Sequence, residues 1–184
     1  MDSDAQSLAK ILEAVAVNEQ FLRLFKDGDR EALLAGMAPA FKTLKERHRV
    51  THFYFIRPDG EIFLRVHAPA QRGDRIARAT YQEAARTGRV ASGVEMGKNF
   101  FSLRVVRPVS LDGQPLGYIE AGEEIDHVFG GYAKLTGFQA ALFLNEDYLA
   151  RKKADVKGEA KNGGKLLEAS DRALFETLHD KRSE

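Results

Sequence analysis

The sequence predicts an α+β domain: a five-stranded antiparallel sheet with a long N-terminal helix and helices on both faces. Two observations carry this prediction. Apolar residues recur at three- and four-residue steps from Asp4 to Lys26, which is the period of an amphipathic helix. Runs rich in β-branched and aromatic residues follow, and the turn signals Arg57–Gly60 and Leu111–Gln114 join them in pairs, as in antiparallel hairpins.

The N-terminal helix is expected over Asp4–Lys26, and at about 1.5 Å per residue it would be roughly 33 Å long. Asp27-Gly28-Asp29 would end it and cap a second helix, in which Pro39 predicts a kink or a break near Ala38. The pair can be read as a helical hairpin that is simply core. The first helix can also be read as a dimer or signalling helix.

The clearest hairpin is expected from Val50–Ile56 and Glu61–His67. A loop then leads to Asp74, which we expect to cap a helix that ends near Thr87. The other expected elements are long strands at Phe100–Val109 and Leu116–Ala121, a helix at Ile125–Leu135 interrupted or loosened at Gly130-Gly131, and a last, fifth strand at Phe138–Leu144. Arg89–Glu95 can be read as a short strand outside these five. The order of elements, with a helix between the second and third strands of the sheet, is that of a PAS-like domain.

We therefore expect three segments: an N-terminal helical hairpin over 1–49, a PAS-like core over 50–144, and a basic loop with a C-terminal helix over 145–184. Arg151–Lys165 is rich in basic residues and contains no aromatic residue for base stacking. It is expected to be an exposed arm or a loose helix, and Leu166–Leu178 a final helix.

Composition excludes several classes of protein. The net charge of +1 gives no indication of a nucleic-acid or acidic-membrane partner. The absence of cysteine excludes disulfides, thiolate metal sites and cysteine nucleophiles. No stretch approaches the ~20 apolar residues of a membrane span, and the N-terminus lacks the features of a signal peptide. Taken literally the chain is cytosolic, but it can equally be the excised part of a longer receptor.

Motifs of catalysis are missing from the sequence. Gly-x-Ser-x-Gly, the Gly-x-x-x-x-Gly-Lys phosphate loop and Gly-x-Gly-x-x-Gly after a strand are all absent. No two histidines have the spacing of a metal site. We therefore expect no enzymatic activity, no metal and no cofactor.

Polar side chains share faces of the expected strands at two-residue spacing: Arg65 with His67, Ser102 with Arg104, and Tyr118 with Glu120. Buried charges need a partner, either an internal carboxylate or a ligand. Two arginines, one histidine and one glutamate leave an excess of positive charge, which favours an anionic or zwitterionic ligand. The alternative is that some of these residues face solvent.

At these residues the chain resembles the Cache-type (PAS-like) extracytoplasmic sensor domains of bacterial chemotaxis receptors and sensor histidine kinases. The matching segments are Phe53–Gly60, Phe63–Pro69 with Gly73-Asp74, Gly93–Glu95, Leu103–Val109 and Leu116–Ile125. The resemblance implies a periplasmic domain with a small-molecule site beneath loops on one face of the sheet, flanked by membrane helices that this chain lacks. Small carboxylates and amino acids are the implied ligand class. We assume a single sensory module.

The leading hypothesis is an extracytoplasmic sensing domain of a transmembrane receptor, such as a methyl-accepting chemotaxis protein, that forms a homodimer through its N-terminal helix. The residues expected to bind the ligand are Arg65, His67, Arg104, Tyr118, Glu120, Phe63, Tyr54 and Ser102. Two alternatives remain: a cytosolic PAS-like protein-interaction module, and a small hydrolase that uses His67 with Glu120. The sequence does not identify the ligand or the output module.

Overall fold

The computed structural model describes residues 2–96, 101–152, 159–161 and 164–180. The chain divides into two compact units. Unit 1 comprises Met1–Glu95 and Ser102–Glu124, and unit 2 comprises Met96–Phe101 and Ile125–Glu184. This division differs from the predicted segments 1–49, 50–144 and 145–184, because the N-terminal helices pack onto the first sheet and the last predicted strand lies in the second unit.

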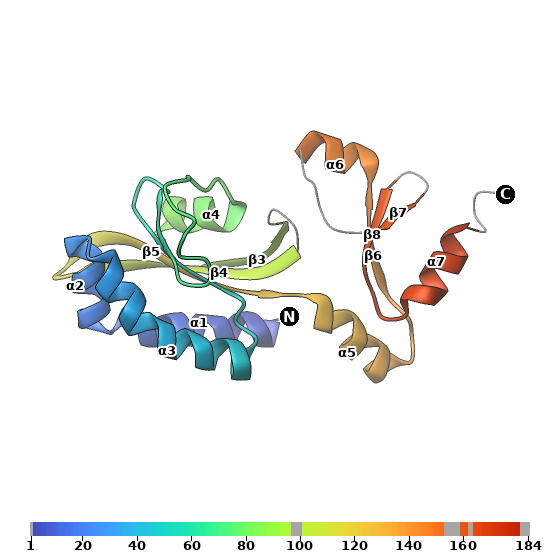
Figure 1. Cartoon of the computed structure of the whole chain (residues 1–184), viewed down its shortest axis with the longest axis horizontal. Coiled ribbons are helices and arrows are strands. Elements are labelled where there is room, and N and C mark those ends of the chain that lie inside the picture. The colour runs from blue at the N-terminus through green and yellow to red at the C-terminus, as the bar shows by residue number, and fades with distance from the viewer. Residues whose placement is uncertain (1, 97–100, 153–158, 162–163, 181–184) are drawn as a thin grey trace. The chain divides into compact units, whose positions relative to one another are not determined.

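Unit 1 contains a five-stranded antiparallel sheet, which confirms the predicted fold class (Figure 1). Its strand order is β2-β1-β5-β4-β3. The strands are β1 (His52–Ile56), β2 (Ile62–Arg65), β3 (Ala91–Met96), β4 (Phe101–Leu111) and β5 (Gln114–Glu124). The register places Tyr54 of β1 opposite both Arg65 of β2 and Glu120 of β5, so these three side chains form a row across the sheet.

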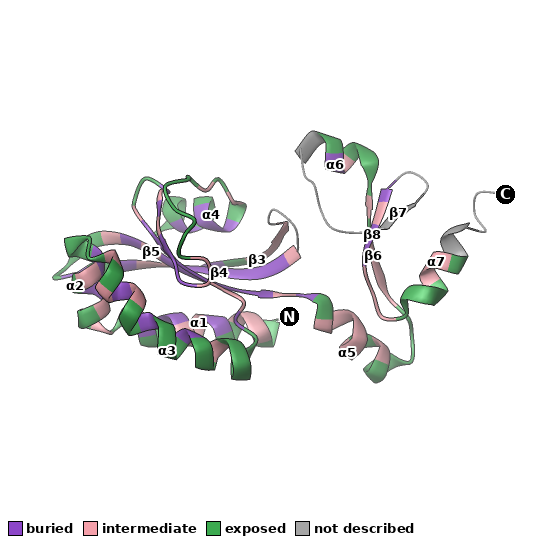
Figure 2. Cartoon of the chain, in the orientation of Figure 1, coloured by how far each residue is buried: buried purple, intermediate pink, exposed green. Residues whose placement is uncertain are grey.

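Helices cover both faces of this sheet (Figure 1). On one face lie α1 (Asp2–Ala16), α2 (Glu19–Asp27) and α3 (Arg30–His48), and on the other lies α4 (Ala79–Thr87). Figure 2 shows that the buried residues of the N-terminal helices are those turned towards the sheet. Phe25 of α2 is fully buried there, with its ring centroid 5.5 Å from that of Phe55.

The long N-terminal helix predicted over Asp4–Lys26 is instead two helices. The break falls at Val17 and Asn18, where the Asn18 side chain accepts a hydrogen bond of 3.2 Å from the amide of Phe21 and caps α2. Asparagine is a favoured N-cap because its side-chain oxygen satisfies a backbone donor that has no helical partner. The break redirects the chain so that Leu12 and Leu22, on successive helices, are both buried.

The break predicted as one alternative near Ala38 does not occur, since α3 runs without interruption through Pro39. Met37 and Phe41 are buried on either side of the proline. Their packing outweighs the loss of one backbone hydrogen bond, which is the cost that proline imposes inside a helix.

The segment before α4 differs from the prediction as well. The helix begins at Ala79 rather than after Asp74, and residues 66–78 form an irregular loop. Asp74 caps no helix, because its carboxylate is bound by Arg65. The loop is fixed by pairing with the β1–β2 hairpin: Ile62 donates to the carbonyl of Asp74 (3.0 Å), and Ile76 donates to that of Gly60 (3.0 Å).

Unit 2 has a sheet of its own, with order β6-β8-β7. Its elements are α5 (Asp126–Thr136), β6 (Ala141–Asn145), α6 (Glu146–Lys152), β7 (Glu159–Lys161), β8 (Gly164–Ala169) and α7 (Arg172–Asp180). Met96, Phe101, Leu142 and Leu144 pack around buried Leu149 and Leu167. The assumption of a single module is therefore wrong.

Four further predictions are corrected in this part of the chain. The fifth strand of the first sheet is β3, and the strand predicted at Phe138–Leu144 belongs to the second sheet. The helix predicted over Leu166–Leu178 is a strand followed by a helix. The interruption predicted at Gly130-Gly131 is absent, because α5 is continuous there. Arg151–Lys165, predicted as an exposed arm or a loose helix, contains β7 and the start of β8. Part of that basic segment, 153–158 and 162–163, lies outside the described residues. Among the described helices, none has the length and apolar character needed to cross a bilayer.

Candidate binding site on the α4 face of the sheet

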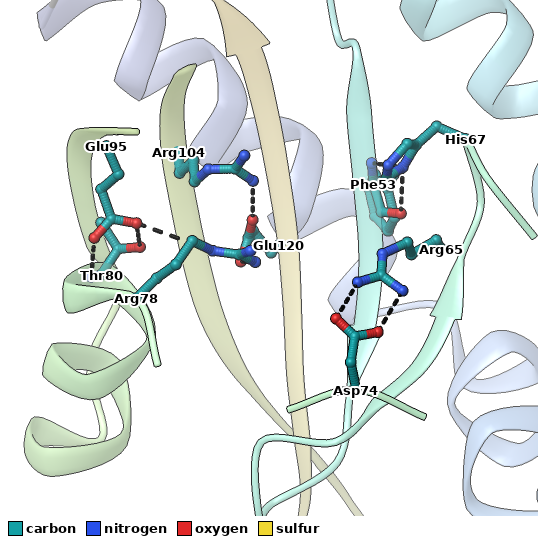
Figure 3. Close-up of polar contacts among 9 residues, drawn as sticks. All are labelled: Phe53, Arg65, His67, Asp74, Arg78, Thr80, Glu95, Arg104 and Glu120. Atoms are coloured by element: carbon teal, nitrogen blue, oxygen red, sulfur yellow. Dashed lines mark hydrogen bonds and ion pairs between the residues drawn. The ribbon is translucent and has the colours of Figure 1, made fainter. Parts of the chain in front are cut away.

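The strands of unit 1 present a row of charged side chains on the face that α4 covers (Figure 3). Alternation along each strand places Tyr54, Arg104 and Glu120 on this face. The structure brings together six of the residues predicted from sequence: Tyr54, Arg65, His67, Arg104, Tyr118 and Glu120.

Glu120 lies at the centre of this face and is held by two arginines. Arg104 Nη1 donates to Glu120 Oε1 over 2.6 Å, and Arg78 Nη2 donates to Glu120 Oε2 over 2.5 Å. Glu120 is completely buried, and the side chains of Arg104 and Arg78 are 3% and 18% exposed. Burial lowers the pKa of Arg104, but the Glu120 carboxylate and Tyr54 together outweigh that effect and raise the pKa above its ordinary value.

The ring of Tyr54 lies among three guanidinium groups. The guanidinium carbons of Arg65, Arg78 and Arg104 are 5.7, 5.1 and 5.9 Å from the ring centroid, within the range of cation–π attraction. We call Arg65, Arg78 and Arg104 the arginine cluster. Three positive charges therefore surround one aromatic ring.

Arg65 is bound by a carboxylate from the loop. Its Nη1 and Nη2 donate to the two oxygens of Asp74 over 2.7 and 2.6 Å, which is the bidentate geometry that arginine forms with carboxylates. The Arg65 side chain is 8% exposed, whereas that of Asp74 is 48% exposed. The hydrogen bonds to Asp74 raise the pKa of Arg65.

Glu95 of β3 lies beside the cluster and binds the start of α4. Its carboxylate accepts hydrogen bonds from the amide and the hydroxyl of Thr80 over 2.8 and 2.9 Å, so an anion occupies the helix N-terminus, where negative charge is favourable. Glu95 also lies 4.0 Å from Arg78 Nε. It therefore couples the position of α4 to the arginine cluster.

Three members of this network were not predicted from sequence: Asp74, Arg78 and Glu95. Asp74 was assigned to a helix cap, and Arg78 lies in a loop that has no periodic pattern. With them, three arginines face three carboxylates, and the predicted excess of positive charge is replaced by balance. The loop before α4 contains three arginines and one aspartate, and this concentration of charge was the signal that could have indicated Asp74 and Arg78.

Phe63 faces the N-terminal helices, whereas Ser102 lies on the same face as the cluster. A register shift in the β1–β2 pair follows Phe55, and Phe63 packs away from the arginine cluster, with its ring centroid 5.2 Å from that of Phe25. Ser102 is 1% exposed and follows the alternation of Arg104. Among the described residues, its hydroxyl and the Nε atoms of Arg78 and Arg104 have no hydrogen-bond partner, so polar capacity remains on this face.

His67 follows the end of β2 and lies against the end of β1. Its Nδ1 is 3.2 Å from the amide nitrogen of Phe53, and as an acceptor it satisfies a backbone donor that would otherwise be unpaired. The imidazole rings of His52 and His67 are 4.8 Å apart. Burial lowers the pKa of His52 to about 3, and the positive charge of Arg104 makes the second-largest contribution. Burial also lowers the pKa of His67 to about 4.

These two histidines predict a loss of stability in acid. Both have a lower pKa in the folded chain than the ordinary value of 6.5, so the unfolded chain binds more protons below that pH. Their contribution to the folding stability is complete above pH 6.5. It is lost as the pH falls towards the folded-state pKa, which is about 4 for His67 and about 3 for His52. Between about pH 7.5 and about pH 5 the loss is expected to be about 1–2 kcal/mol, with allowance for partial exposure.

The measurement is urea unfolding at both pH values for the wild type and for the double variant His52→Gln/His67→Gln. The variant removes the contribution of the two histidines to the pH dependence of stability and leaves the contribution of the carboxylates in place. A variant that loses as much stability in acid as the wild type would contradict the role assigned to the histidines.

Comparison with known proteins agrees with this architecture. The chain matches the family described as the double sensory domain of two-component sensor kinase over residues 1–178. Similar solved structures include the sensor domain of the Vibrio cholerae histidine kinase DctB, with TM-score 0.59 and 10% identity, covering 98% of this chain and 74% of that one. The sensor domain of E. coli DcuS has TM-score 0.55 and 16% identity, covering 69% of this chain and 92% of that one.

A third similar structure is the periplasmic domain of Vibrio cholerae LuxQ, with TM-score 0.52 and 11% identity, covering 93% of this chain and 74% of that one. At these identities the likeness concerns the fold. No curated protein matches the chain. The family match spans both compact units, and the chain therefore belongs to the Cache-type family of double sensory domains of two-component sensor kinases.

Proposed function

We propose that this chain is the extracytoplasmic part of a membrane receptor and that it binds small carboxylates on the α4 face of its first sheet. The observation that carries the proposal is the arginine cluster: three guanidinium groups around one tyrosine ring, two of them sharing a single buried carboxylate.

The chemistry of the cluster suits a carboxylate ligand. Arginine presents a planar fork of donors that matches the two oxygens of a carboxylate. Buried surroundings strengthen such bonds, since water competes less for the charges. The Nε atoms of Arg78 and Arg104 and the Ser102 hydroxyl are donors without a described acceptor, and they support the binding of a further polar group.

Aromatic residues beside the cluster support binding of the rest of the molecule. Tyr54 and Tyr81 are buried, and Tyr118 packs against them with its ring centroid 5.1 Å from that of Tyr81. Ligand sites of this kind combine apolar walls with a few polar groups that fix orientation. Of the eight residues predicted from sequence, we retain Tyr54, Arg65, Arg104, Tyr118, Glu120 and Ser102 in the proposed site.

His67 and Phe63 are assigned supporting roles. His67 holds the start of β1 through the backbone of Phe53, and Phe63 stabilises the contact between the hairpin and α2. The hydrolase alternative loses support for the same reason. His67 is hydrogen-bonded to the backbone, and Glu120 is bound by two arginines, so neither has the role that a catalytic pair requires.

The family favours a sensor kinase as the output of the receptor over the chemotaxis receptor expected first. The likeness to the LuxQ periplasmic domain supports a periplasmic location. A homodimer through the N-terminal helices stays part of the proposal, with α1 in the place of the longer helix that we expected.

A thermal-shift screen tests this function. The screen compares small carboxylic acids and amino acids with the amides of the same acids, which keep the shape and lose the charge. A carboxylate at a hundred times its dissociation constant is expected to add about 2.7 kcal/mol to the stability, and its amide is expected to add nothing. Equal shifts from acids and amides, or no shift from any acid, would refute a carboxylate site.

A further inference from the structure

We infer that Asp74 occupies the fork of Arg65 in place of a ligand carboxylate, so that binding is an exchange of one carboxylate for another. This inference rests on the proposed function and deepens it, since it assigns the ligand a position and a charge. The carboxylate of Asp74 makes the bidentate contact that a ligand would make, with two bonds of 2.7 and 2.6 Å to Arg65.

The two carboxylates that contact the cluster most closely differ in how easily they can leave. Glu120 projects from the central strand β5, is completely buried and is bound by two arginines. Asp74 projects from the loop 66–78, and its side chain is 48% exposed while that of its partner Arg65 is 8% exposed. A half-exposed side chain can turn into water at small cost, so Asp74 is the replaceable anion of the network.

The exchange requires the Asp74 side chain to turn away from Arg65. The backbone at this point is held independently, because Ile62 donates to the Asp74 carbonyl over 3.0 Å and Gly73 donates to the Ile62 carbonyl over 3.4 Å. The loop therefore keeps its path while the carboxylate leaves. Arg65 stays in place as well, beside the ring of Tyr54.

The balance of charge then sets the class of ligand. Arg65, Arg78 and Arg104 face Asp74, Glu95 and Glu120. When Asp74 turns outward, one incoming carboxylate restores the balance, and any second charge on the ligand would be unpaired in a buried position. The ligand is therefore a monocarboxylate with an otherwise uncharged body, which the tyrosine rings beside the cluster would contact.

Calorimetric titration of butyrate into the wild type and Asp74→Asn tests the exchange. Removing the competing carboxylate is expected to tighten binding about two- to fivefold, which is the effect of losing a half-exposed ion pair. If Asp74 instead contacted a cationic group of the ligand, Asp74→Asn would weaken ligand binding. The direction of the change therefore decides the role of Asp74.

Asp59→Asn is the matched control. Asp59 binds Arg75, the neighbour of Asp74 in the loop, over 2.6 Å, and its side chain is 46% exposed. The control removes the same charge from the same region and leaves the Arg65 fork occupied. Butyrate affinity is expected to stay at the wild-type value in this variant.

A matched set of four-carbon probes tests the ligand charge. Butyrate carries one negative charge, succinate two, γ-aminobutyrate one of each sign, and butyramide none. The wild type is expected to bind butyrate more tightly than the other three. Tighter binding of succinate or γ-aminobutyrate would overturn the assignment of a monocarboxylate.

The outcomes separate this inference from the proposed function. If the wild type binds butyrate and Asp74→Asn binds it equally or more weakly, the exchange is wrong and the proposed function stands. Equal gains in Asp74→Asn and Asp59→Asn would indicate a general effect of charge and would also overturn the exchange. If both the wild type and Asp74→Asn bind no carboxylate of the set or of the screen, both proposals fail.

Discussion

Replacing Glu120 with glutamine is expected to lower the free energy of unfolding by about 3–5 kcal/mol, because removal of one member of a buried ion pair leaves uncompensated charge. Arg104, 3% exposed, and Arg78, 18% exposed, both bind this carboxylate. Glutamine keeps the size and one acceptor of the side chain, so the loss reports the charge. Urea unfolding at neutral pH measures it.

Glu83→Gln provides the control. Glu83 pairs with Arg86 on the surface of α4, and the two side chains are 51% and 71% exposed. An exposed pair of this kind contributes about 0.2–1 kcal/mol. Similar losses in the two variants would show that Glu120 is not the charged centre of the network.

Gly117→Ala is expected to destabilise the chain by about 2–4 kcal/mol, from backbone strain and a steric clash together. Gly117 lies in β5 with φ +144°, which favours glycine, and a Cβ there would be 2.3 Å from the Ile56 carbonyl oxygen. The backbone of β1 or β5 must therefore move, and Tyr118 and Glu120 follow in the same strand. Thermal or urea unfolding measures the loss.

Gly113→Ala is its control in the same hairpin. Gly113 also has a positive φ, +75°, but a Cβ there meets nothing within 4 Å. The expected cost is about 1 kcal/mol, from the backbone conformation alone. A loss in Gly117→Ala no larger than this would contradict the close approach of β5 to β1.

The sheet of unit 1 could be predicted because its signals are local. The turn at Arg57–Gly60 and the β-branched runs of the long strands specify hairpins within a few residues. The break at Asn18 and the continuity of α3 through Pro39 could not be predicted in this way. Both depend on what the helices pack against, and tertiary packing overrides local propensity.

The candidate site was predictable in part for the same reason. Two-residue spacing on strands placed Arg104 and Glu120 on the correct face, and pairing of neighbouring strands brought them into contact. The spacing misplaced Phe63, because a register shift in the β1–β2 pair breaks the alternation. Asp74 and Arg78 approach from a loop, and the path of an irregular loop is not encoded in any periodic pattern.

The second sheet was missed although β6 overlaps the strand predicted at Phe138–Leu144, because its partner strands β7 and β8 carry weak signals. Leu166–Ala169 continues into helical spacing of leucines towards Leu178, so periodicity alone favoured one helix. The pairing of β6 with β8, such as Phe143 opposite Leu166, is a long-range contact. Such contacts follow from packing and not from local sequence.

The most direct test of the central claim is calorimetric titration of the tightest-binding carboxylate from the screen into the wild type, Arg78→Ala and Arg75→Ala. Both arginines belong to the loop before α4, but Arg78 is in the cluster while Arg75 pairs with Asp59 and is 69% exposed. Loss of a charged hydrogen bond to the ligand is expected to weaken binding to Arg78→Ala at least about tenfold, with Arg75→Ala unchanged. Wild-type affinity in Arg78→Ala would contradict a carboxylate site built on the arginine cluster.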